Sequence, residues 1–282
     1  MAKKISKELE QIIIDNYNDG KSPYWMVENI EELKDKKPNV IYGILKRLGV
    51  KTKREIVLTD EQRLSRRKFN VDDNYFENID TPEKAYWLGF IYADGWLLSN
   101  EDKIGITLCK EDECHLEAFK KAVKSESPIK TYNQTSGYAN GEDYVRILIT
   151  SKKMKQDLIK YGVLIQKTEI LEFPSLDKNL YSHFIRGYFD GDGSLTYGGT
   201  LVNGNRVFNI KFVGTKEMLE SIQTILGLNL KLGQRNPERD VNNYDFTING
   251  NVQVKRIMDY LYNNSTIHLE RKYNRYLELI NQ

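Results

Sequence analysis

The chain contains two similar nine-residue segments, and this internal repeat constrains its fold more than any other feature of the sequence. The first segment is WLGFIYADG at residues 87–95, and the second is IRGYFDGDG at residues 185–193. Asp94 and Asp192 hold the same place in the two copies and lie 98 residues apart. A repeat of this spacing predicts a chain built from two similar structural units.

After each segment, the hydrophobic pattern predicts the same order of strands and helices. In the first copy we expect strands near 103–109, 129–132 and 144–150, and helices near 113–123 and 153–161. In the second we expect strands near 194–197, 207–213, 230–234 and 244–248, and helices near 216–226 and 252–262. Asn-Gly pairs at 140–141 and 203–204 favour antiparallel hairpins. The predicted fold class is α+β, a pseudo-twofold tandem αββαββα repeat with half 1 at residues 81–175 and half 2 at residues 176–282.

Small residues recur at matching places in the two segments. Gly89 and Ala93 are four residues apart and therefore share one face of a helix, and Gly187 and Gly191 hold the same places in the second copy. A glycine inside a helix costs about 1 kcal/mol relative to alanine, so its repeated use indicates a structural need. We expect these four residues to form an interface between two helices whose backbones come close together.

Each segment ends in Asp-Gly, which predicts the end of a helix with the glycine in a left-handed conformation. Asp94 and Asp192 then lie at helix C-termini, where the helix dipole carries about half a negative charge. Two carboxylates brought together at such a place repel each other, and divalent cations would relieve both effects. The carboxylates of Asp94 and Asp192, with the last-turn carbonyl groups of Ala93 and Gly191, form a candidate site for Mg²⁺ or Mn²⁺. A metal ion held there near phosphates could activate water.

Residues 1–50 predict a small all-α domain of three short helices. The third, near residues 39–48, has an apolar face that includes Val40 and Leu48, and a polar face that carries Tyr42, Lys46 and Arg47. This arrangement suggests a helix-turn-helix-like domain that places its third helix in the major groove of DNA. A plain three-helix bundle that docks on the rest of the chain is the alternative.

Residues 51–80 predict a basic linker that contacts DNA or packs loosely on the following domain. The net charge of the whole chain is only +2, but nine basic and three acidic residues fall between positions 46 and 68. Such a local excess of positive charge is typical of a phosphate-binding stretch, although a solvated linker is equally compatible with it. The DNA-binding candidates in this stretch are Lys53, Arg54, Arg66 and Arg67.

Composition excludes several classes of protein. Hydrophobic residues make up 40% and charged residues 29% of the chain, as in a soluble globular protein. No segment predicts a membrane span, and the charged N-terminus lacks the apolar core of a signal peptide, so we expect an intracellular location. Cys109 and Cys114 have no second pair to complete a zinc site, and we expect both to be reduced.

The two segments resemble the motifs of the LAGLIDADG homing endonucleases, in the single-chain form that carries two motifs. The eighth motif position is that family's metal-binding acid, which falls here at Asp94 and Asp192. The N-terminal region resembles the helix-turn-helix extensions of some of these enzymes. Two places depart from the pattern. The sixth is Tyr92 in the first segment and Asp190 in the second, and the second is Leu88 and Arg186 rather than alanine. We expect the Arg186 side chain to point away from the helix interface. Neither change touches the eighth position.

The resemblance implies a metal-dependent endonuclease that cuts double-stranded DNA at a long, non-palindromic site and leaves short 3′ overhangs. It implies a monomer whose two sheets form saddles along the major groove, and a lysine near each acid, for which Lys167 and Lys272 are the candidates. The strand residues expected to contact DNA are Lys103, Thr107, Lys130, Tyr132, Arg146, Lys211, Lys231, Gln234 and Arg235, although alternation alone leaves open which strand face does so.

Two other functions fit the same scaffold. One is a DNA-binding regulator without catalysis, which the survival of both acids disfavours. The other is an RNA maturase whose partner would be an intron RNA, and the sequence leaves this alternative open.

Overall fold

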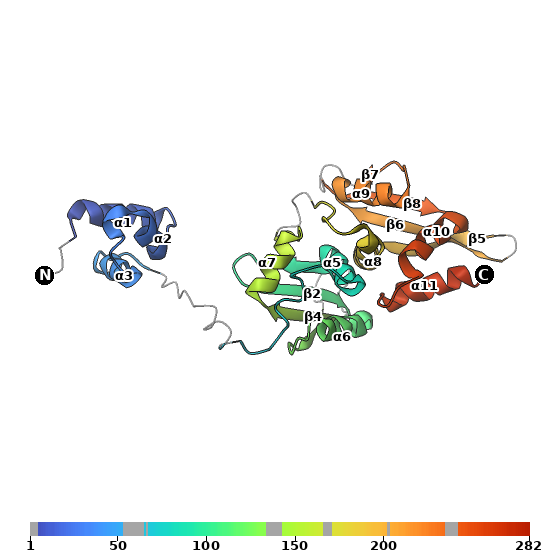
Figure 1. The fold of residues 1–282 in the computed structure, drawn as a ribbon, viewed down its shortest axis with the longest axis horizontal. Coiled ribbons are helices and arrows are strands. Elements are labelled where there is room, and N and C mark those ends of the chain that lie inside the picture. The colour runs from blue at the N-terminus through green and yellow to red at the C-terminus, as the bar shows by residue number, and fades with distance from the viewer. Residues whose placement is uncertain are drawn as a thin grey trace. The chain divides into compact units, whose positions relative to one another are not determined.

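The computed structural model describes residues 5–52, 65, 67–133, 143–165, 171–201, 204–234 and 242–282. The chain divides into two compact units, Met1–Arg66 and Arg67–Gln282 (Figure 1). None of the helices in the described residues is both long and apolar enough to cross a membrane.

The first unit consists of α1 (Lys7–Asn18), α2 (Pro23–Asn29), a 3₁₀ turn (Glu31–Leu33) and α3 (Pro38–Arg47). Serine side chains begin the first two helices, because Ser6 accepts a hydrogen bond from the Leu9 amide and Ser22 accepts one from the Trp25 amide. The three helices enclose one small core, formed by Ile13, Met26, Leu33, Ile41, Ile44 and Leu45. The expected three-helix unit is therefore present.

The faces of α3 differ from the prediction. Tyr42, expected on the polar face, is only 9% exposed, whereas Val40 and Leu48, expected on the apolar face, are 43% and 36% exposed. The buried face of this helix therefore includes Tyr42 and excludes Val40. Periodicity over ten residues could not predict this placement, because Tyr42 is amphipathic and can occupy either face.

The second unit contains the tandem αββαββα repeat, which confirms the predicted fold class. Half 1 consists of α5 (Pro82–Asp94), β1 (Gly95–Leu97), β2 (Lys103–Cys109), α6 (Glu113–Ala122), β3 (Ile129–Asn133), β4 (Asp143–Thr150) and α7 (Lys152–Lys160). Half 2 consists of α8 (Tyr181–Asp192), β5 (Ser194–Thr200), β6 (Arg206–Gly214), α9 (Lys216–Leu226), β7 (Gly233–Gln234), β8 (Tyr244–Asn249), α10 (Asn251–Tyr262) and α11 (Glu270–Ile280).

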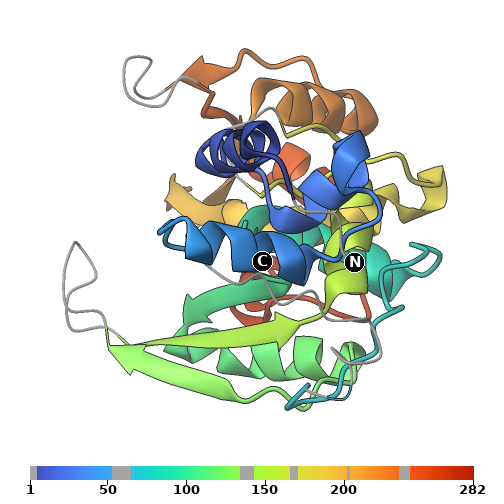
Figure 2. The ribbon, with the colours of Figure 1, turned by 90° about the vertical axis from the view of Figure 1, so that its left-hand side faces the viewer.

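Each half contains one four-stranded antiparallel sheet, and the two sheets have equivalent strand orders. The orders are β1-β2-β4-β3 and β5-β6-β8-β7. Trp96 pairs with Gly105 in the first sheet, and Ser194 pairs with Lys211 at the equivalent place in the second. Helix α6 packs on β2 and β4 and lies along one face of the first sheet (Figure 2). Helices α5 and α8 lie between the two sheets (Figure 1).

Three elements differ from the predictions. The short strand β1 and the helix α11 were not expected, and β7 is two residues long where a five-residue strand was predicted. The expected linker also ends earlier, because Phe76 is fully buried in the core of the second unit. Residues 67–80 therefore belong to that unit, and the linker prediction is wrong for this part of the chain.

Candidate active site

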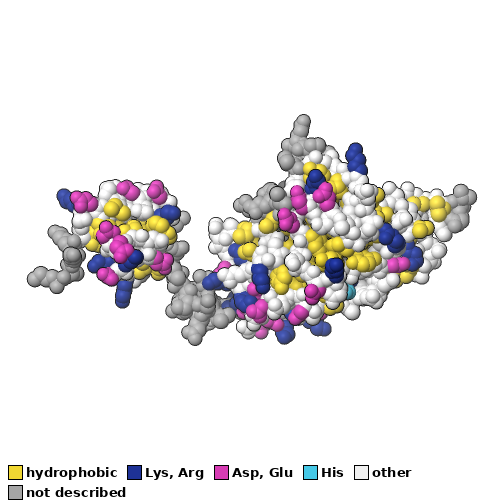
Figure 3. All heavy atoms as spheres, turned by 45° about the horizontal axis from the view of Figure 1, so that its top comes forward, with side chains coloured by type: hydrophobic (Ala, Val, Ile, Leu, Met, Phe, Trp, Pro, Cys, Tyr) yellow, Lys and Arg dark blue, Asp and Glu magenta, His cyan; other side chains and the backbone are white. Residues whose placement is uncertain are grey.

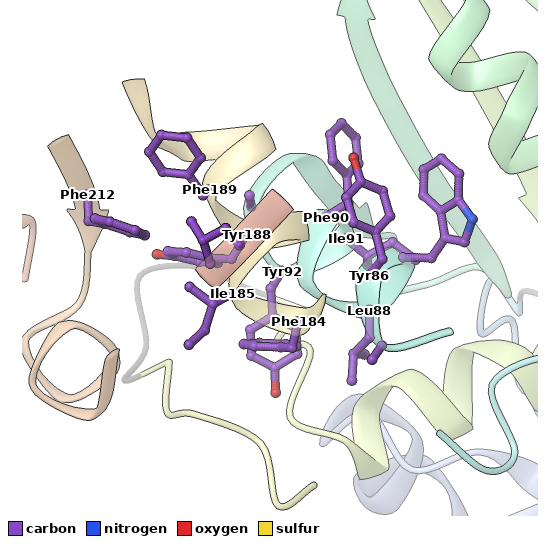
Figure 4. Packing of buried hydrophobic residues seen from close by; sticks show 14 of the residues in the cluster. Tyr86, Leu88, Phe90, Ile91, Tyr92, Phe184, Ile185, Tyr188, Phe189 and Phe212 are labelled. Carbon is purple, nitrogen blue, oxygen red and sulfur yellow. The ribbon is translucent and has the colours of Figure 1, made fainter. Parts of the chain in front are cut away.

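The two central helices, α5 and α8, contact each other through their glycines. A Cβ atom added to Gly89 would lie 2.0 Å from the carbonyl oxygen of Phe184, and one added to Gly187 would lie 2.0 Å from that of Tyr86. The backbones are thus as close as the repeated small residues suggested. Figure 4 shows the aromatic side chains that surround this contact, with Tyr92 and Phe184 packed edge to face.

The contact continues to the ends of both helices, where the acids lie. A Cβ atom on Gly191 would lie 2.3 Å from the Ala93 Cβ and 3.1 Å from a carboxylate oxygen of Asp94. Asp94, at the end of α5, therefore lies against Gly191 in the last turn of α8, and Gly191 is the residue before Asp192. The structure brings the ends of the two repeated segments together at one place.

The glycines that follow the acids do not have the left-handed conformation that we expected. Gly95 has φ −76° and Gly193 has φ −80°, both in extended backbone. Glycine is needed there for space instead, because an added Cβ would lie 2.6 Å from the Ile91 carbonyl oxygen or 2.2 Å from the Phe189 ring. The chain passes directly from each helix into the first strand of its sheet.

Lys272, from α11, reaches the end of α8. Its side chain is 3% exposed, and its ammonium group donates to the carbonyl oxygens of Phe189 (2.5 Å), Asp190 (2.7 Å) and Gly193 (2.5 Å). These are carbonyls at the negative end of the helix dipole, where a cation is stabilising. The Gly191 carbonyl, expected to bind metal, is 3.5 Å from the same ammonium and so faces a cation of the protein itself.

The electrostatics of Lys272 link it to both acids. Burial lowers its pKa to about 8, and attraction to Asp190, Asp94 and Asp192 opposes that shift. One ammonium therefore lies within electrostatic reach of both repeated carboxylates. Lys272 as a residue of the active site stays a prediction, and Lys167, the other predicted lysine, lies outside the described residues.

A divalent cation fits this donor set only in part. Two carboxylates and nearby carbonyl oxygens are the hard ligands that Mg²⁺ takes. In the described part of the chain, no cluster of three or more His, Cys, Asp or Glu side chains could hold a metal. A cation bound by Asp94 and Asp192 would need further oxygen ligands from water or from a substrate phosphate, which is how Mg²⁺ is commonly held.

A third carboxylate, Asp190, is completely buried in the same helix α8 as Asp192. It accepts hydrogen bonds from the Tyr86 hydroxyl (2.7 Å), the Leu269 amide (2.8 Å) and the Tyr262 hydroxyl. Tyr86 comes from α5 and also lies 2.9 Å from His115 Nε2. The network crosses from half 2 to half 1, and it was not predicted from the sequence.

Arg186 is also buried, at 1% exposure. Its Nε donates to the Ile267 carbonyl oxygen and its Nη1 to that of Leu261, so the side chain runs toward the α10–α11 connection. Its guanidinium carbon lies 5.2 Å from the centroid of the Tyr86 ring, on the opposite helix. The Arg186 side chain therefore points away from the glycine contact, as expected, but its guanidinium still contacts Tyr86 of half 1.

The sheets decide which strand residues face outward. Ile106 and Ile147 are buried in the core, so the alternate residues Lys130, Arg146 and Thr107 lie on the outer face of the first sheet. The same alternation places Lys103 and Tyr132 on the outer face of the first sheet and Lys211 on that of the second.

Gln234 does not share that face. It pairs with Tyr244, whose side chain packs against the core, and this places Gln234 on the inner side of the second sheet. Lys231 precedes β7 and is exposed. Arg235 lies outside the described residues.

The basic residues of the N-terminal region are divided between free and paired groups. Lys46 is exposed, and Arg47 forms an ion pair with Glu10 of α1. Arg67 donates to both carboxylate oxygens of Asp73, at 2.7 and 2.8 Å, so its guanidinium already binds a carboxylate of the protein. Burial raises the pKa of Asp73, but hydrogen bonds from Arg67 and Ser151 hold it below its usual value. Lys53, Arg54 and Arg66 lie outside the described residues.

Charges of both signs are mixed on the visible surface of the first unit (Figure 3). Its described residues therefore show no purely basic face in this view. The two cysteines are free, and Cys109 donates to Asp112.

Comparisons with known proteins return structures only. No family model and no curated protein match the chain. Among the solved structures, the meganuclease I-SmaMI bound to uncleaveable DNA matches with 14% identity and a TM-score of 0.49, over 71% of this chain and 89% of that chain.

Two further solved structures are similar at the same level. The LAGLIDADG meganuclease I-AabMI, bound to uncleaved DNA, has 12% identity and a TM-score of 0.45 over 71% of this chain and 89% of its own. The LAGLIDADG homing endonuclease I-LtrWI, bound to target DNA, has 14% identity and a TM-score of 0.46 over 74% of this chain and 90% of its own. These names belong to the family that the two segments resemble. Likeness at this level assigns no activity to this chain.

Proposed function

We propose that this chain is a LAGLIDADG homing endonuclease, a metal-dependent enzyme that cuts double-stranded DNA at a long, non-palindromic site and leaves short 3′ overhangs. One observation carries the proposal. The Asp94 carboxylate lies against Gly191 in the last turn of α8, the residue before Asp192, and the buried ammonium of Lys272 is attracted to both acids. A structural role alone does not require two acids at the negative ends of two adjoining helices.

Asp94 and Asp192 would hold Mg²⁺ or Mn²⁺ together with water and phosphate oxygens. When bound, the cation would activate water and stabilise charge on the cleaved phosphodiester. The protein residues have separate roles. Lys272 donates to carbonyl groups at the end of α8, and its charge would offset the repulsion between the two carboxylates. The close backbone contacts at Gly89 and Gly187 would fix the spacing of the two helix ends.

The outer faces of the two sheets would contact the DNA. Lys130 and Arg146 on the first sheet and Lys211 on the second have the basic chemistry that binds phosphates and guanine edges. The exposed Lys46 of α3 would add a contact from the first unit. Because the two sheets carry different side chains on equivalent strands, the two half-sites would differ in sequence. Two halves in one chain would let the enzyme act as a monomer.

Cleavage of a plasmid library tests the proposal. The purified chain is incubated with Mg²⁺ and plasmids that carry randomised inserts, and the ends of linear products are sequenced. The control is the double variant Asp94→Asn/Asp192→Asn. Linear product with defined 3′ overhangs, lost in the double variant and after chelation of the metal, is the expected result.

Two other outcomes would favour the alternatives. Selection of one DNA sequence by both proteins, without cleavage by either, would indicate a DNA-binding regulator. Binding of both proteins to a structured intron RNA but not to DNA would indicate a maturase. Either outcome would contradict the proposed endonuclease.

A further inference from the structure

Arg146, on the outer face of the first sheet, is surrounded by three aromatic rings. Its guanidinium carbon lies 5.6 Å from the ring centroid of Trp96, 5.2 Å from that of Tyr132 and 5.5 Å from that of Tyr144. Its Nε donates to Thr107 Oγ1 at 3.1 Å. The two tyrosine rings are themselves stacked, with centroids 5.3 Å apart. These contacts fix the plane of the guanidinium before any ligand arrives.

Gly105 provides the space for this cluster. It pairs with Trp96 across the β1–β2 ladder, and a Cβ atom added to it would lie 2.2 Å from Cζ2 of the indole. The indole therefore lies directly on the glycine. Because Trp96 follows the Asp94-Gly95 pair in sequence, the cluster begins two residues after a candidate catalytic acid.

Arg146 has no acidic partner among the described residues. The ion pairs of that part of the chain include Lys211 with Asp245 and Arg67 with Asp73, but none with Arg146. With Nε taken by Thr107, the two terminal nitrogens can donate side by side to a pair of acceptor atoms. Two ligands of DNA present such a pair, the O6 and N7 atoms of guanine and the oxygens of a phosphate.

The second sheet has different chemistry at the equivalent place. Arg146 pairs with Thr107 and Asp245 pairs with Val213, at matching positions relative to the Trp96–Gly105 and Ser194–Lys211 pairs. The counterpart of Arg146 is therefore a carboxylate, which lies 3.2 Å from the Lys211 ammonium. The two halves cannot make the same contact to DNA at this step.

We propose that Arg146 is a specificity-determining residue that recognises a guanine in the major groove, with Trp96, Tyr132, Tyr144 and Thr107 as its positioning residues. The inference rests on the proposed function, since it requires that the outer sheet faces bind DNA. Half 1 selects guanine at one step of its half-site, and half 2 does not select guanine at the symmetric step. The target departs from a palindrome at this pair of positions.

Binding selection from a randomised duplex library tests this inference. The wild-type chain and the variants Arg146→Lys and Arg146→Gln are compared in the presence of a chelator, so that binding is measured without cleavage. Lysine keeps the charge but cannot donate to two acceptors from a planar fork. We expect a guanine preference at one step in the wild type, reduced about 10- to 100-fold in both variants while preferences at other steps persist.

Two matched variants separate recognition from other effects. Lys130→Ala removes the cross-strand neighbour of Arg146, and we expect it to weaken all sequences about equally, as loss of a phosphate contact does. Gly105→Ala displaces Trp96, and we expect a smaller loss of the same guanine preference with Arg146 intact.

An even loss of affinity for all sequences in the Arg146 variants would overturn the inference and assign Arg146 to a phosphate. An unchanged guanine preference would also overturn it. Failure of the wild-type chain to select any DNA would overturn the proposed function itself, and the inference with it.

Discussion

Gly89 and Gly187 occupy equivalent positions on the two central helices, and each meets the backbone of the opposite helix at the same distance. An added Cβ would lie 2.0 Å from a carbonyl oxygen in both cases, that of Phe184 for Gly89 and that of Tyr86 for Gly187. The contact is therefore nearly twofold symmetric, although the two halves differ in sequence. It sets the distance between the two helix ends.

We expect Gly89→Ala and Gly187→Ala each to destabilise the second unit by about 2–4 kcal/mol, because backbone atoms cannot move away as side chains can. The measurement is the free energy of unfolding in urea. Gly43→Ala on α3 is the control, since no atom lies within 4 Å of the added Cβ. There we expect the first unit to gain up to about 1 kcal/mol. Equal tolerance at all three sites would contradict the close contact.

The buried carboxylate of Asp190 should contribute to stability through its three donors. Asp190→Asn places an amide group where donors converge, and we expect a loss of about 2–4 kcal/mol. Tyr86→Phe removes one hydrogen bond across the two halves and should cost about 1–2 kcal/mol. Tyr260→Phe, at a side chain 43% exposed, is the control. The idea fails if Asp190→Asn unfolds at the same urea concentration as the control.

His115 should make stability depend on pH. Burial lowers its pKa to about 4, so below pH 6.5 the unfolded chain binds a proton that the folded chain does not. Above pH 6.5 the His115 side chain is neutral in both states and does not lower the free energy of unfolding. As the pH falls toward 4, protonation of the unfolded chain lowers the free energy of unfolding by roughly 3 kcal/mol at most.

His115→Gln removes this titration, and unfolding of both proteins in urea between pH 4 and 7 isolates it. We expect the wild type to lose more stability than the variant over that range. Parallel pH profiles for the two proteins would show that His115 titrates normally.

Lys272 should act on cleavage more than on DNA binding. Lys272→Met removes the ammonium that lies at the end of α8, and we expect cleavage to slow by about 100-fold or more while the DNA affinity changes little. Lys255→Met, at an exposed lysine of α10, is the control and should leave both unchanged. Equal loss of affinity and cleavage in Lys272→Met would instead indicate a DNA-binding role.

Local signals explain which elements could be predicted from the sequence. Helix α9 was predicted with its observed ends, because Thr215 caps it and Gly227, with φ +65°, ends it in a left-handed conformation. Strand β1 has only three residues and exists because it pairs with β2, so no local pattern marked it. Helix α11 did carry a signal, since Lys272, Tyr276 and Leu279 are buried at helical spacing.

The candidate site was predictable where it depends on the repeat. Matching positions in the two segments identified Asp94 and Asp192 and the glycine contact. The Asp190 network was not predictable, because Tyr86 and Tyr262 reach it from 104 residues before and 72 residues after in the sequence. The aromatic cluster around Arg146 also required the strand register, since Trp96, Tyr132 and Tyr144 come from three different strands.

Binding of Mn²⁺ to the protein with its selected DNA tests most directly whether Asp94 and Asp192 form one metal site. Electron paramagnetic resonance of free Mn²⁺ during a titration measures the affinity of the wild type, Asp94→Asn and Asp192→Asn, with the exposed Asp177→Asn as control. The predicted result is that either single variant weakens Mn²⁺ binding and that Asp177→Asn does not. The expected loss is at least roughly 10- to 100-fold, because this is what it costs to remove a residue that only hydrogen-bonds to a metal ligand. Unchanged Mn²⁺ affinity in both Asp94→Asn and Asp192→Asn would contradict the shared site.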